Sequence, residues 1–328
     1  MPAIYTMGQK IDHYQVIRLL GRGGASHVYL AQDWLALQEV VLKFPDDDVI
    51  GGAAVFERYQ REAQIGKRLS HPYILQHLNQ GEQRSAEYLV LEYVRGRTLR
   101  MVMKKFAPEL LPTGEVLRIL LQVCDALVYA HECGVIHRDI KPENIMLLEN
   151  GDIKLLDFGI ALIEGERQVG WQVFSSPIGT PDYMAPERLL GQRGDARADI
   201  YAVGVVLYEL LCGRTPFEET DGFAIITRHI SHDPQGILQF NPALSPALAT
   251  VVMRAIRRDP ERRYACMQDM LYDLGYLDTV TPMDYIPDPP KLGGRYRQAI
   301  RIALIVLIVF LFIVAFGLLA QFAHHLAR

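Results

Sequence analysis

The residues best suited to chemistry are polar side chains at the two ends of a predicted β-hairpin. The apolar runs 145–148 and 153–156 flank Asn150-Gly151, and Asn-Gly between apolar runs is a strong hairpin signal because both residues tolerate a positive φ. A two-residue turn there would place Asn144 opposite Asp157, with their Cβ atoms about 5 Å apart. Carboxylate and amide oxygens are ligands that Mg²⁺ prefers, so the pattern predicts a metal site at the open end of the hairpin.

Two more polar residues, Asp139 and Lys141, lie just before the first apolar run. Together with Asn144 and Asp157 they would bring a base, a cation and two metal ligands to one place. A structural hairpin with polar ends does not account for that combination. We therefore predict a phosphoryl-transfer site, where positioning and electrostatic stabilisation supply most of the catalysis.

These residues resemble the signature of protein kinases, with His-Arg-Asp-x-Lys-x-x-Asn at 137–144 and Asp-Phe-Gly at 157–159. The similarity is to bacterial serine/threonine kinases of the eukaryotic (Hanks) type, and it extends over residues 11–277. It implies an α+β bilobal protein kinase fold, with a small β-rich N-lobe that carries one key helix and a larger helical C-lobe. It also implies ATP as the phosphate donor, Mg²⁺ (or Mn²⁺) as the metal and protein hydroxyls as acceptors.

The resemblance assigns a role to each residue of the predicted site. Asp139 would orient the substrate hydroxyl and accept its proton, and Lys141 would neutralise charge on the transferring phosphate. Asn144 and Asp157 would hold the metal. Lysine at position 141 favours serine or threonine over tyrosine as the acceptor.

A glycine-rich segment over residues 19–30 has the pattern of strand, turn and strand. Glycine there lets backbone N–H groups approach phosphate oxygens without a Cβ in the way. The chain has no Gly-x-x-x-x-Gly-Lys-Ser/Thr sequence, which argues against a P-loop ATPase. The kinase pattern Gly-x-Gly-x-x-Gly-x-Val is met at Gly21, Gly23 and Val28, with Ser26 in place of the third glycine.

The rest of the nucleotide site follows from the resemblance alone. Lys43, at the end of an apolar strand, would hold the α- and β-phosphates and pair with Glu62 on the helix predicted over 56–69. Val41 and Leu91 would line the adenine pocket, and the backbone of the segment after Leu91 would bind the base. The predicted nucleotide-binding residues are Leu20, Gly21, Gly23, Val28, Val41, Lys43, Glu62, Leu91, Glu92 and Val94.

Residues 157–187 correspond to the activation segment of the family. A phosphate on Ser175 or Ser176 could pair with Arg138 and order the segment. Thr180 is a third candidate, although the resemblance implies that its hydroxyl instead belongs to a substrate-docking turn and bridges the catalytic aspartate and lysine. For any single serine, an exposed loop hydroxyl is the simpler interpretation.

Two further contacts are implied outside the catalytic residues themselves. Asp199 opens a long apolar helix that continues to Leu211. A helix-capping role is the simpler interpretation, but the resemblance implies that Asp199 braces the backbone of the catalytic loop. It also implies an ion pair between Glu187 and Arg263.

Gly66 is a departure from the family, which has a leucine one turn after the paired glutamate. That leucine would stack towards Phe158 and His137, so we expect a gap beside Gly66 that weakens the seating of the helix. Gly66→Leu would then raise the basal rate, and a second copy of the chain could seat the helix in the unmodified protein. The alternative is that Ile65 repacks into the space.

Composition and the C-terminal part of the chain bear on location. The net charge of −4 gives no indication of nucleic-acid binding, and the four cysteines lack the spacing of a zinc site. Residues 278–301 have the composition of a Pro/Gly-containing basic linker, and 302–320 are free of charged or polar side chains, long enough to cross a bilayer. The basic residues that precede this run predict a single-pass inner-membrane protein with a cytoplasmic kinase domain and a short outer tail, 321–328.

Three functions compete at this point. The leading hypothesis is an active, membrane-anchored serine/threonine kinase that acts on proteins and on its own activation segment, with a homodimer as a candidate assembly. The alternative is a pseudokinase scaffold that binds nucleotide or a partner without catalysis. The presence of Lys43, Glu62, Asp139, Asn144 and Asp157 favours the enzyme. A small-molecule phosphotransferase is disfavoured by the Ala-Pro-Glu sequence at 185–187.

Overall fold

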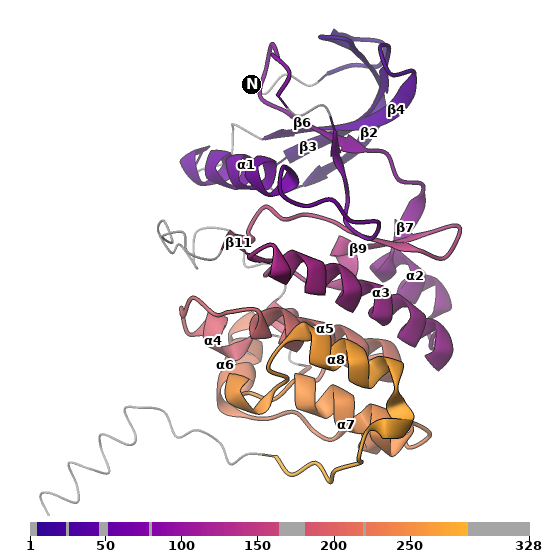
Figure 1. Cartoon of the computed structure of the whole chain (residues 1–328), viewed down its shortest axis with the longest axis vertical. Coiled ribbons are helices and arrows are strands. Elements are labelled where there is room, and N and C mark those ends of the chain that lie inside the picture. Colours follow the sequence, from indigo (N-terminus) through magenta and orange to yellow (C-terminus); the bar gives the residue numbers. More distant parts are fainter. Residues whose placement is uncertain are drawn as a thin grey trace, which may run out of the picture. The chain divides into compact units, whose positions relative to one another are not determined.

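A six-stranded antiparallel sheet forms the first lobe of the molecule. The computed structural model describes residues 5–23, 26–45, 52–78, 81–163, 181–218 and 221–287. The strand order is β1-β2-β3-β4-β6-β5, and helix α1 (Gly52–Gly66) lies beside the sheet (Figure 1). The strands are β1 (Lys10–Ile11), β2 (Tyr14–Gly23), β3 (Ser26–Asp33), β4 (Gln38–Pro45), β5 (His77–Leu78) and β6 (Leu89–Glu92).

Helices dominate the second lobe. They are α2 (Leu99–Phe106), α3 (Thr113–Glu132), α4 (Pro186–Leu189), α5 (Arg197–Cys212), α6 (Gly222–Ser231), α7 (Pro246–Ala255) and α8 (Met267–Gly275). Short 3₁₀ helices connect them: η1 (Pro142–Asn144), η2 (Pro181–Tyr183), η3 (Ile237–Gln239), η4 (Pro260–Arg262) and η5 (Leu277–Thr279). Two small sheets complete the lobe, one of β7 (Gly96–Thr98), β9 (Ile145–Leu148) and β10 (Ile153–Leu155), the other of β8 (Val135–Ile136) and β11 (Leu162–Ile163).

The hydrophobic patterns in the sequence explain these elements. Side chains of β4 alternate between buried and less buried positions, as period two requires. Apolar residues recur at helical spacing in α3 and are buried, namely Val116, Ile119, Leu120, Val123, Leu127 and Ala130. Helix α5 is buried continuously from Ala198 to Leu211. A left-handed glycine, Gly213 with φ +73, ends α5. The expected α+β fold with a β-rich lobe and a helical lobe is confirmed.

Buried apolar side chains gather in two separate cores. One lies within the sheet and includes Tyr14, Leu42 and Tyr88. The other fills the helical lobe, and it also contains Ile65 of α1 and Leu69 just after that helix. The buried side chains at the end of α1 thus belong to the core of the helical lobe rather than to that of the sheet.

The predicted hairpin over residues 145–156 is present, but its predicted register is wrong. Ile153 pairs with Leu147 and Leu155 pairs with Ile145. The loop has three residues, Glu149 to Gly151, closed by a hydrogen bond from Leu148 N to Asp152 O at 2.8 Å. Of these loop residues only Gly151 takes a positive φ, at +88°, as in a three-residue hairpin loop with a glycine in the left-handed region.

The predicted membrane anchor, 302–320, lies outside the described residues, as does most of the linker before it. Within the described part of the chain, no helix has the length and apolarity needed to cross a bilayer. The boundaries of 11 and 277 for the kinase domain stay a prediction.

Candidate active site

The catalytic loop brings three predicted residues to one carboxylate oxygen. Oδ2 of Asp139 accepts hydrogen bonds from Nζ of Lys141 and from Nδ2 of Asn144, both at 2.8 Å. Nδ2 of Asn144 also donates to the backbone carbonyl of Asp139 at 2.8 Å. The 3₁₀ helix η1, with Pro142 at its first position, carries Asn144 back over the loop. Base, cation and amide are therefore held together by local structure.

Asp199 holds this loop from behind. Its two oxygens accept the backbone N–H groups of His137 and Arg138, both at 2.8 Å, and His131 Nε2 lies 2.9 Å away. Burial by itself would raise the pKa of the Asp199 carboxyl, but the contact with His131 and these N–H groups hold it below its usual value. Arg138 has a φ of +69°, which a non-glycine residue adopts at a cost. The bracing contact predicted for Asp199 is thus present and fixes a strained turn.

Lys43 connects the two lobes. Its Nζ lies 2.8 Å from both carboxylate oxygens of Glu62 and 3.5 Å from Oδ1 of Asp157. Burial opposes the charge on Lys43, but the two carboxylates more than offset it, so that the pKa of Lys43 is raised. Desolvation likewise acts to raise the pKa of Asp157, yet Lys43 and the N–H of Gly159 hold it below its usual range. The lysine is therefore protonated and held between a helix and the catalytic lobe.

Four of the other predicted nucleotide-binding residues share one face of the sheet with Lys43. Cross-strand partners point to the same face, as do residues two apart. Val28 pairs with Lys43, Val41 precedes Lys43 by two positions, and Leu91 pairs with Val41. Gly21 pairs with Val28. The sheet core lies on the opposite face, through side chains such as Leu42.

The remaining predicted nucleotide contacts lie at the two ends of this face. Leu20 is half-buried in β2, and Gly23 pairs with Ser26 where the strands β2 and β3 meet. Glu92 ends β6, and its side chain binds Lys154 at 2.6 Å. Val94 follows with a half-buried side chain. The ion pair with Lys154, which lies on β10, thus connects Glu92 to the helical lobe.

The two predicted metal ligands do not face each other as hairpin partners. The corrected register puts Leu156 opposite Asn144, with a hydrogen bond from Leu156 N to Asn144 O at 2.9 Å. Asp157 follows with φ +60° and turns towards Lys43. Both side chains still suit a hard cation. Within the described residues, the side-chain hydrogen bonds of Asn144 are made by its nitrogen, which leaves the amide oxygen available to a cation. The side chain of Asp157 is 47% exposed.

The expected gap beside Gly66 is absent, which removes the structural reason for the two expectations built on it. A Cβ placed on Gly66 would lie 2.2 Å from Cγ and 2.3 Å from Nδ1 of His77. The imidazole of His77 fills the space, so neither a void nor a repacked Ile65 describes this site. A leucine at position 66 would collide with the ring, which removes the reason to expect a faster enzyme.

A basic cluster of Arg61, Arg138, Arg188 and Arg193 surrounds the start of the activation segment. Arg61 binds the carbonyl of Ala161 at 3.2 Å, and Arg193 binds that of Ile163 at 3.4 Å. Arg188 donates to the carbonyl of Arg138. Burial and the charges of its neighbours lower the pKa of Arg138. The cluster favours an anion, and the predicted phosphorylation positions Ser175, Ser176 and Thr180 lie outside the described residues.

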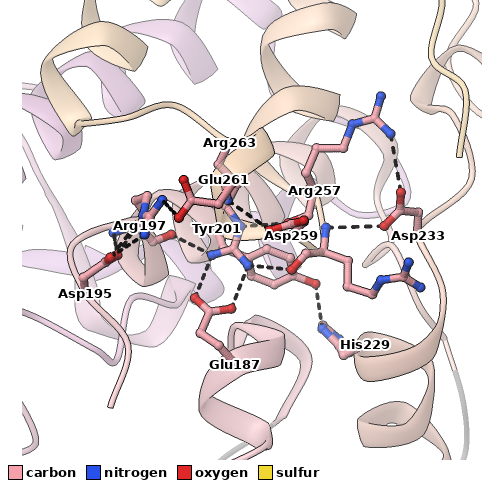
Figure 2. Close-up of polar contacts among 11 residues, drawn as sticks. Glu187, Asp195, Arg197, Tyr201, His229, Asp233, Arg257, Asp259, Glu261 and Arg263 are labelled. Atoms are coloured by element: carbon pink, nitrogen blue, oxygen red, sulfur yellow. Dashed lines mark hydrogen bonds and ion pairs between the residues drawn. The ribbon is translucent and has the colours of Figure 1, made fainter. Parts of the chain in front are cut away.

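The end of the activation segment is anchored by the predicted ion pair. Arg263 donates to both oxygens of Glu187, at 2.8 and 2.7 Å, and to the carbonyls of Arg257, Arg197 and Arg258. Figure 2 shows this guanidinium at the centre of the network, beside Tyr201. The contact predicted for Glu187 and Arg263 is present.

A network around Arg100 was missed by sequence reasoning. From α2, Arg100 donates to Glu143 on η1 and to Glu209 on α5, each at 2.7 Å, and to the hydroxyl of Tyr183 on η2. It therefore joins the catalytic loop to the end of the activation segment. No local pattern marks Arg100, because its partners lie 43 to 109 positions away.

Comparison with known proteins agrees with this geometry. The family described as "Protein kinase domain" matches residues 14–273. The probable serine/threonine-protein kinase PknB of Corynebacterium glutamicum is 39% identical over 277 residues, which cover 81% of this chain and 42% of that protein. For the serine/threonine-protein kinase PrkC of Bacillus subtilis the identity is 35% over 269 residues, with 82% and 41% covered.

A solved structure shares the fold. The crystal structure of the Mycobacterium tuberculosis PknI kinase domain superposes with a TM-score of 0.65 at 29% identity and covers 83% of this chain and 99% of that one. This chain spans only about two fifths of the length of the curated relatives named above.

Proposed function

Because the chain belongs to the protein kinase family, we propose that it transfers the γ-phosphate of ATP to serine or threonine hydroxyls of proteins. The observation that carries the proposal is the position of Lys43, which contacts Glu62 and Asp157 at once. A scaffold that only binds a partner has no need for this arrangement, and one that binds nucleotide without catalysis has no need for Asp139 held by Lys141 and Asn144. The pseudokinase alternative is therefore disfavoured.

The residues on the sheet and those on the catalytic loop have different roles in the proposed transfer. Lys43, held by Glu62, offers a fixed positive charge to the α- and β-phosphates. Asn144 and Asp157 would hold Mg²⁺, which neutralises phosphate charge when bound. Asp139 is positioned to accept the proton of the acceptor hydroxyl, and Lys141, bound to the same carboxylate, lies where negative charge would develop.

The protein would also act on itself and at a membrane. The basic cluster at the start of the activation segment supports a phosphate on Ser175, Ser176 or Thr180, because a dianion would offset the crowded guanidinium charges. The uncharged run 302–320 supports attachment to the inner membrane, with the catalytic domain in the cytoplasm. Two chains in the same membrane would meet readily, which supports phosphorylation of one copy by another.

The test is Asp139→Asn, which keeps the shape of the side chain and removes the base. We expect MgATP binding to persist, because the nucleotide contacts lie on β2 to β4 and β6, while phosphate transfer falls by ~10²–10⁴-fold, the contribution typical of a general base. Asp278→Asn, at an exposed position of η5, is the matched control.

Two results would contradict the proposal. Transfer at the wild-type rate by Asp139→Asn would remove Asp139 from its role. A wild-type chain that binds MgATP but incorporates no phosphate into itself or into protein substrates would establish the scaffold instead.

A further inference from the structure

The segment 281–287 packs against helix α7 although it lies outside the part of the chain that matches the kinase family. That match ends at residue 273. Figure 1 shows the segment, in yellow, beside α7. The backbone N–H of Met283 donates to Oγ1 of Thr250, a residue of α7 that is buried. The backbone of the segment is therefore bound to the helical lobe.

Arg257, two residues after α7, is the side chain that this segment contacts most closely. Its Nη1 donates to the carbonyl of Ile286 at 2.8 Å, and its Cζ lies 4.4 Å from the centre of the Tyr285 ring. The same Nη1 lies 3.4 Å from Oδ2 of Asp233, a fully buried carboxylate. Because a buried carboxylate is costly without a counter-charge, Asp233 and the segment hold Arg257 in one orientation.

The peptide bond between Arg257 and Arg258 joins these contacts to the activation segment. Its N–H, from Arg258, donates to Oδ1 of Asp233 at 3.3 Å, and its C=O, from Arg257, accepts from Nε of Arg263 at 2.7 Å. A peptide unit is planar, so it cannot rotate without weakening both bonds. Arg263 in turn binds Glu187, as Figure 2 shows. A continuous chain of contacts thus runs from residues 281–287 to Glu187.

We propose that Arg257 is a positioning residue: held by the segment 281–287, it fixes the peptide between residues 257 and 258 and so keeps Arg263 on Glu187, at the end of the activation segment. Loss of the segment from α7 loosens that end and weakens binding of the protein substrate. The segment belongs to the linker predicted at 278–301, so a change at the linker reaches the activation segment by this route. The inference rests on the proposed kinase activity only where substrate kinetics serve as a readout.

The primary readout is hydrogen exchange at the end of the activation segment, measured on the full chain without nucleotide or substrate. Peptides over 186–192 report on the N–H groups of Leu189, Leu190 and Gln192, which donate to the carbonyls of residues 185–187. Peptides of α3, whose buried side chains belong to the core of the helical lobe, report on general destabilisation. The comparison separates a local effect from a global one.

Two variants remove the contact with the segment at different points. Tyr285→Ala removes the ring beside the guanidinium, and Arg257→Met removes the charge and the donors. Arg257→Lys keeps the charge but not the planar group, so it is the conservative variant. Tyr272→Ala, at a 54% exposed position of α8, is the matched control for the loss of a tyrosine ring.

We expect exchange over 186–192 to become about tenfold faster in Tyr285→Ala and Arg257→Met, the size of the weaker hydrogen bonds to charged groups. Arg257→Lys should have a smaller effect, and Tyr272→Ala none. Exchange in α3 should not change in any of them. In the same variants KM for a protein substrate should rise while KM for ATP stays at the wild-type value. If Arg257→Met does not fold, Tyr285→Ala and Arg257→Lys carry the comparison.

The proposal is overturned by unchanged exchange over 186–192 in Tyr285→Ala, or by an acceleration that is equally large in α3 or in the Tyr272→Ala control. Because exchange needs no phosphate transfer, a chain without kinase activity still gives an answer. An active enzyme with unchanged exchange would remove the positioning role and leave the proposed function in place.

Discussion

Arg263 and Glu187 lie 76 positions apart in the sequence and form a bidentate ion pair, with N–O distances of 2.8 and 2.7 Å. Both side chains are buried, at 3% and 7% exposure. Among the described residues, the other hydrogen bonds of this guanidinium go to the backbone carbonyls of Arg257, Arg197 and Arg258. The pair therefore helps to fasten the end of the activation segment to the helical lobe.

Glu187→Gln should strongly destabilise the fold, because it leaves a buried guanidinium without its counter-charge. Breaking a buried pair on one side typically costs about 3–5 kcal/mol. Urea unfolding, followed by tryptophan fluorescence or circular dichroism, measures the change. Arg95→Gln breaks the exposed pair with Glu39 and should leave the midpoint where it is. Equal unfolding midpoints for the two variants would mean that the buried pair contributes no more to stability than the exposed one.

Arg100→Met should slow phosphate transfer with little change in KM for ATP. The variant removes the cation shared by Glu143, Glu209 and Tyr183, so the catalytic loop loses its tie to the activation segment. The nucleotide contacts lie on the other lobe, which is why the effect belongs in kcat. Steady-state kinetics with a protein substrate tests this split, and Lys104→Gln, exposed on the same helix, is the control. A change confined to KM for ATP would argue against the network as a support of the loop.

Acid should destabilise the protein through His229. Burial lowers the pKa of His229 to about 3, whereas an unfolded histidine titrates near 6.5. Between those values the unfolded state binds the extra proton, so stability is full above pH 6.5 and is lost as the pH falls through 6.5 towards 3. At pH 5.5 the loss for one such group is about 1.4 kcal/mol.

The comparison of stability at pH 7.5 and 5.5 by urea unfolding isolates this group. His229→Gln keeps a polar partner for Tyr201, whose hydroxyl lies 2.7 Å from His229 Nδ1, and it should remove about 1.4 kcal/mol of the pH dependence. An unchanged pH dependence in the variant would assign the acid sensitivity to other groups.

The full chain should stay with membranes after carbonate extraction, whereas residues 1–290 should appear in the soluble fraction and retain transfer activity. The physical reason is the uncharged run 302–320, which is long enough to cross a bilayer. Alkaline carbonate does not extract a segment that spans the bilayer. Immunoblots of both fractions decide the matter. Release of the full chain by carbonate would exclude the anchor.

The charged constellation could be predicted from sequence because its members lie in short, specific motifs. Asp139, Lys141 and Asn144 fall within one loop, and their contacts are local. The pair of Lys43 and Glu62 depended on the resemblance, since nothing in the residues between them fixes the distance that the structure shows at 2.8 Å.

The errors have identifiable causes. The predicted hairpin register is wrong because the prediction assumed a two-residue turn at Asn150-Gly151, whereas the loop also includes Glu149. A shift of one residue in the register changes which face of the sheet each side chain is paired on. The gap predicted beside Gly66 is wrong because a glycine in the sequence does not show which neighbouring side chain fills the space. His77 comes from a strand 11 positions further on, and only the folded chain shows that the two meet.

Substitution of Gly151 tests the three-residue hairpin loop that replaces the predicted two-residue turn. With φ at +88°, a β-branched residue there is strained, and its Cβ would also lie 2.7 Å from Nη1 of Arg118. Gly151→Val should therefore lower stability by about 1–2 kcal/mol, whereas Gly151→Asn, which tolerates this region, should cost less. Thermal unfolding of the two variants provides the comparison. Equal losses would mean that crowding by Arg118, not backbone strain, controls this position.

Helix α1 shares its buried side chains with the helical lobe rather than with the sheet beside it. Regions that share a core tend to open together. In hydrogen-exchange experiments the amides of α1 near Ile65 should therefore exchange with those of α3 and α5, while β2 to β4 form a separate, less protected unit. The boundary between these units runs between Glu62 and Lys43, so opening of the less protected unit would dismantle the phosphate-binding site while the core of the helical lobe is still intact.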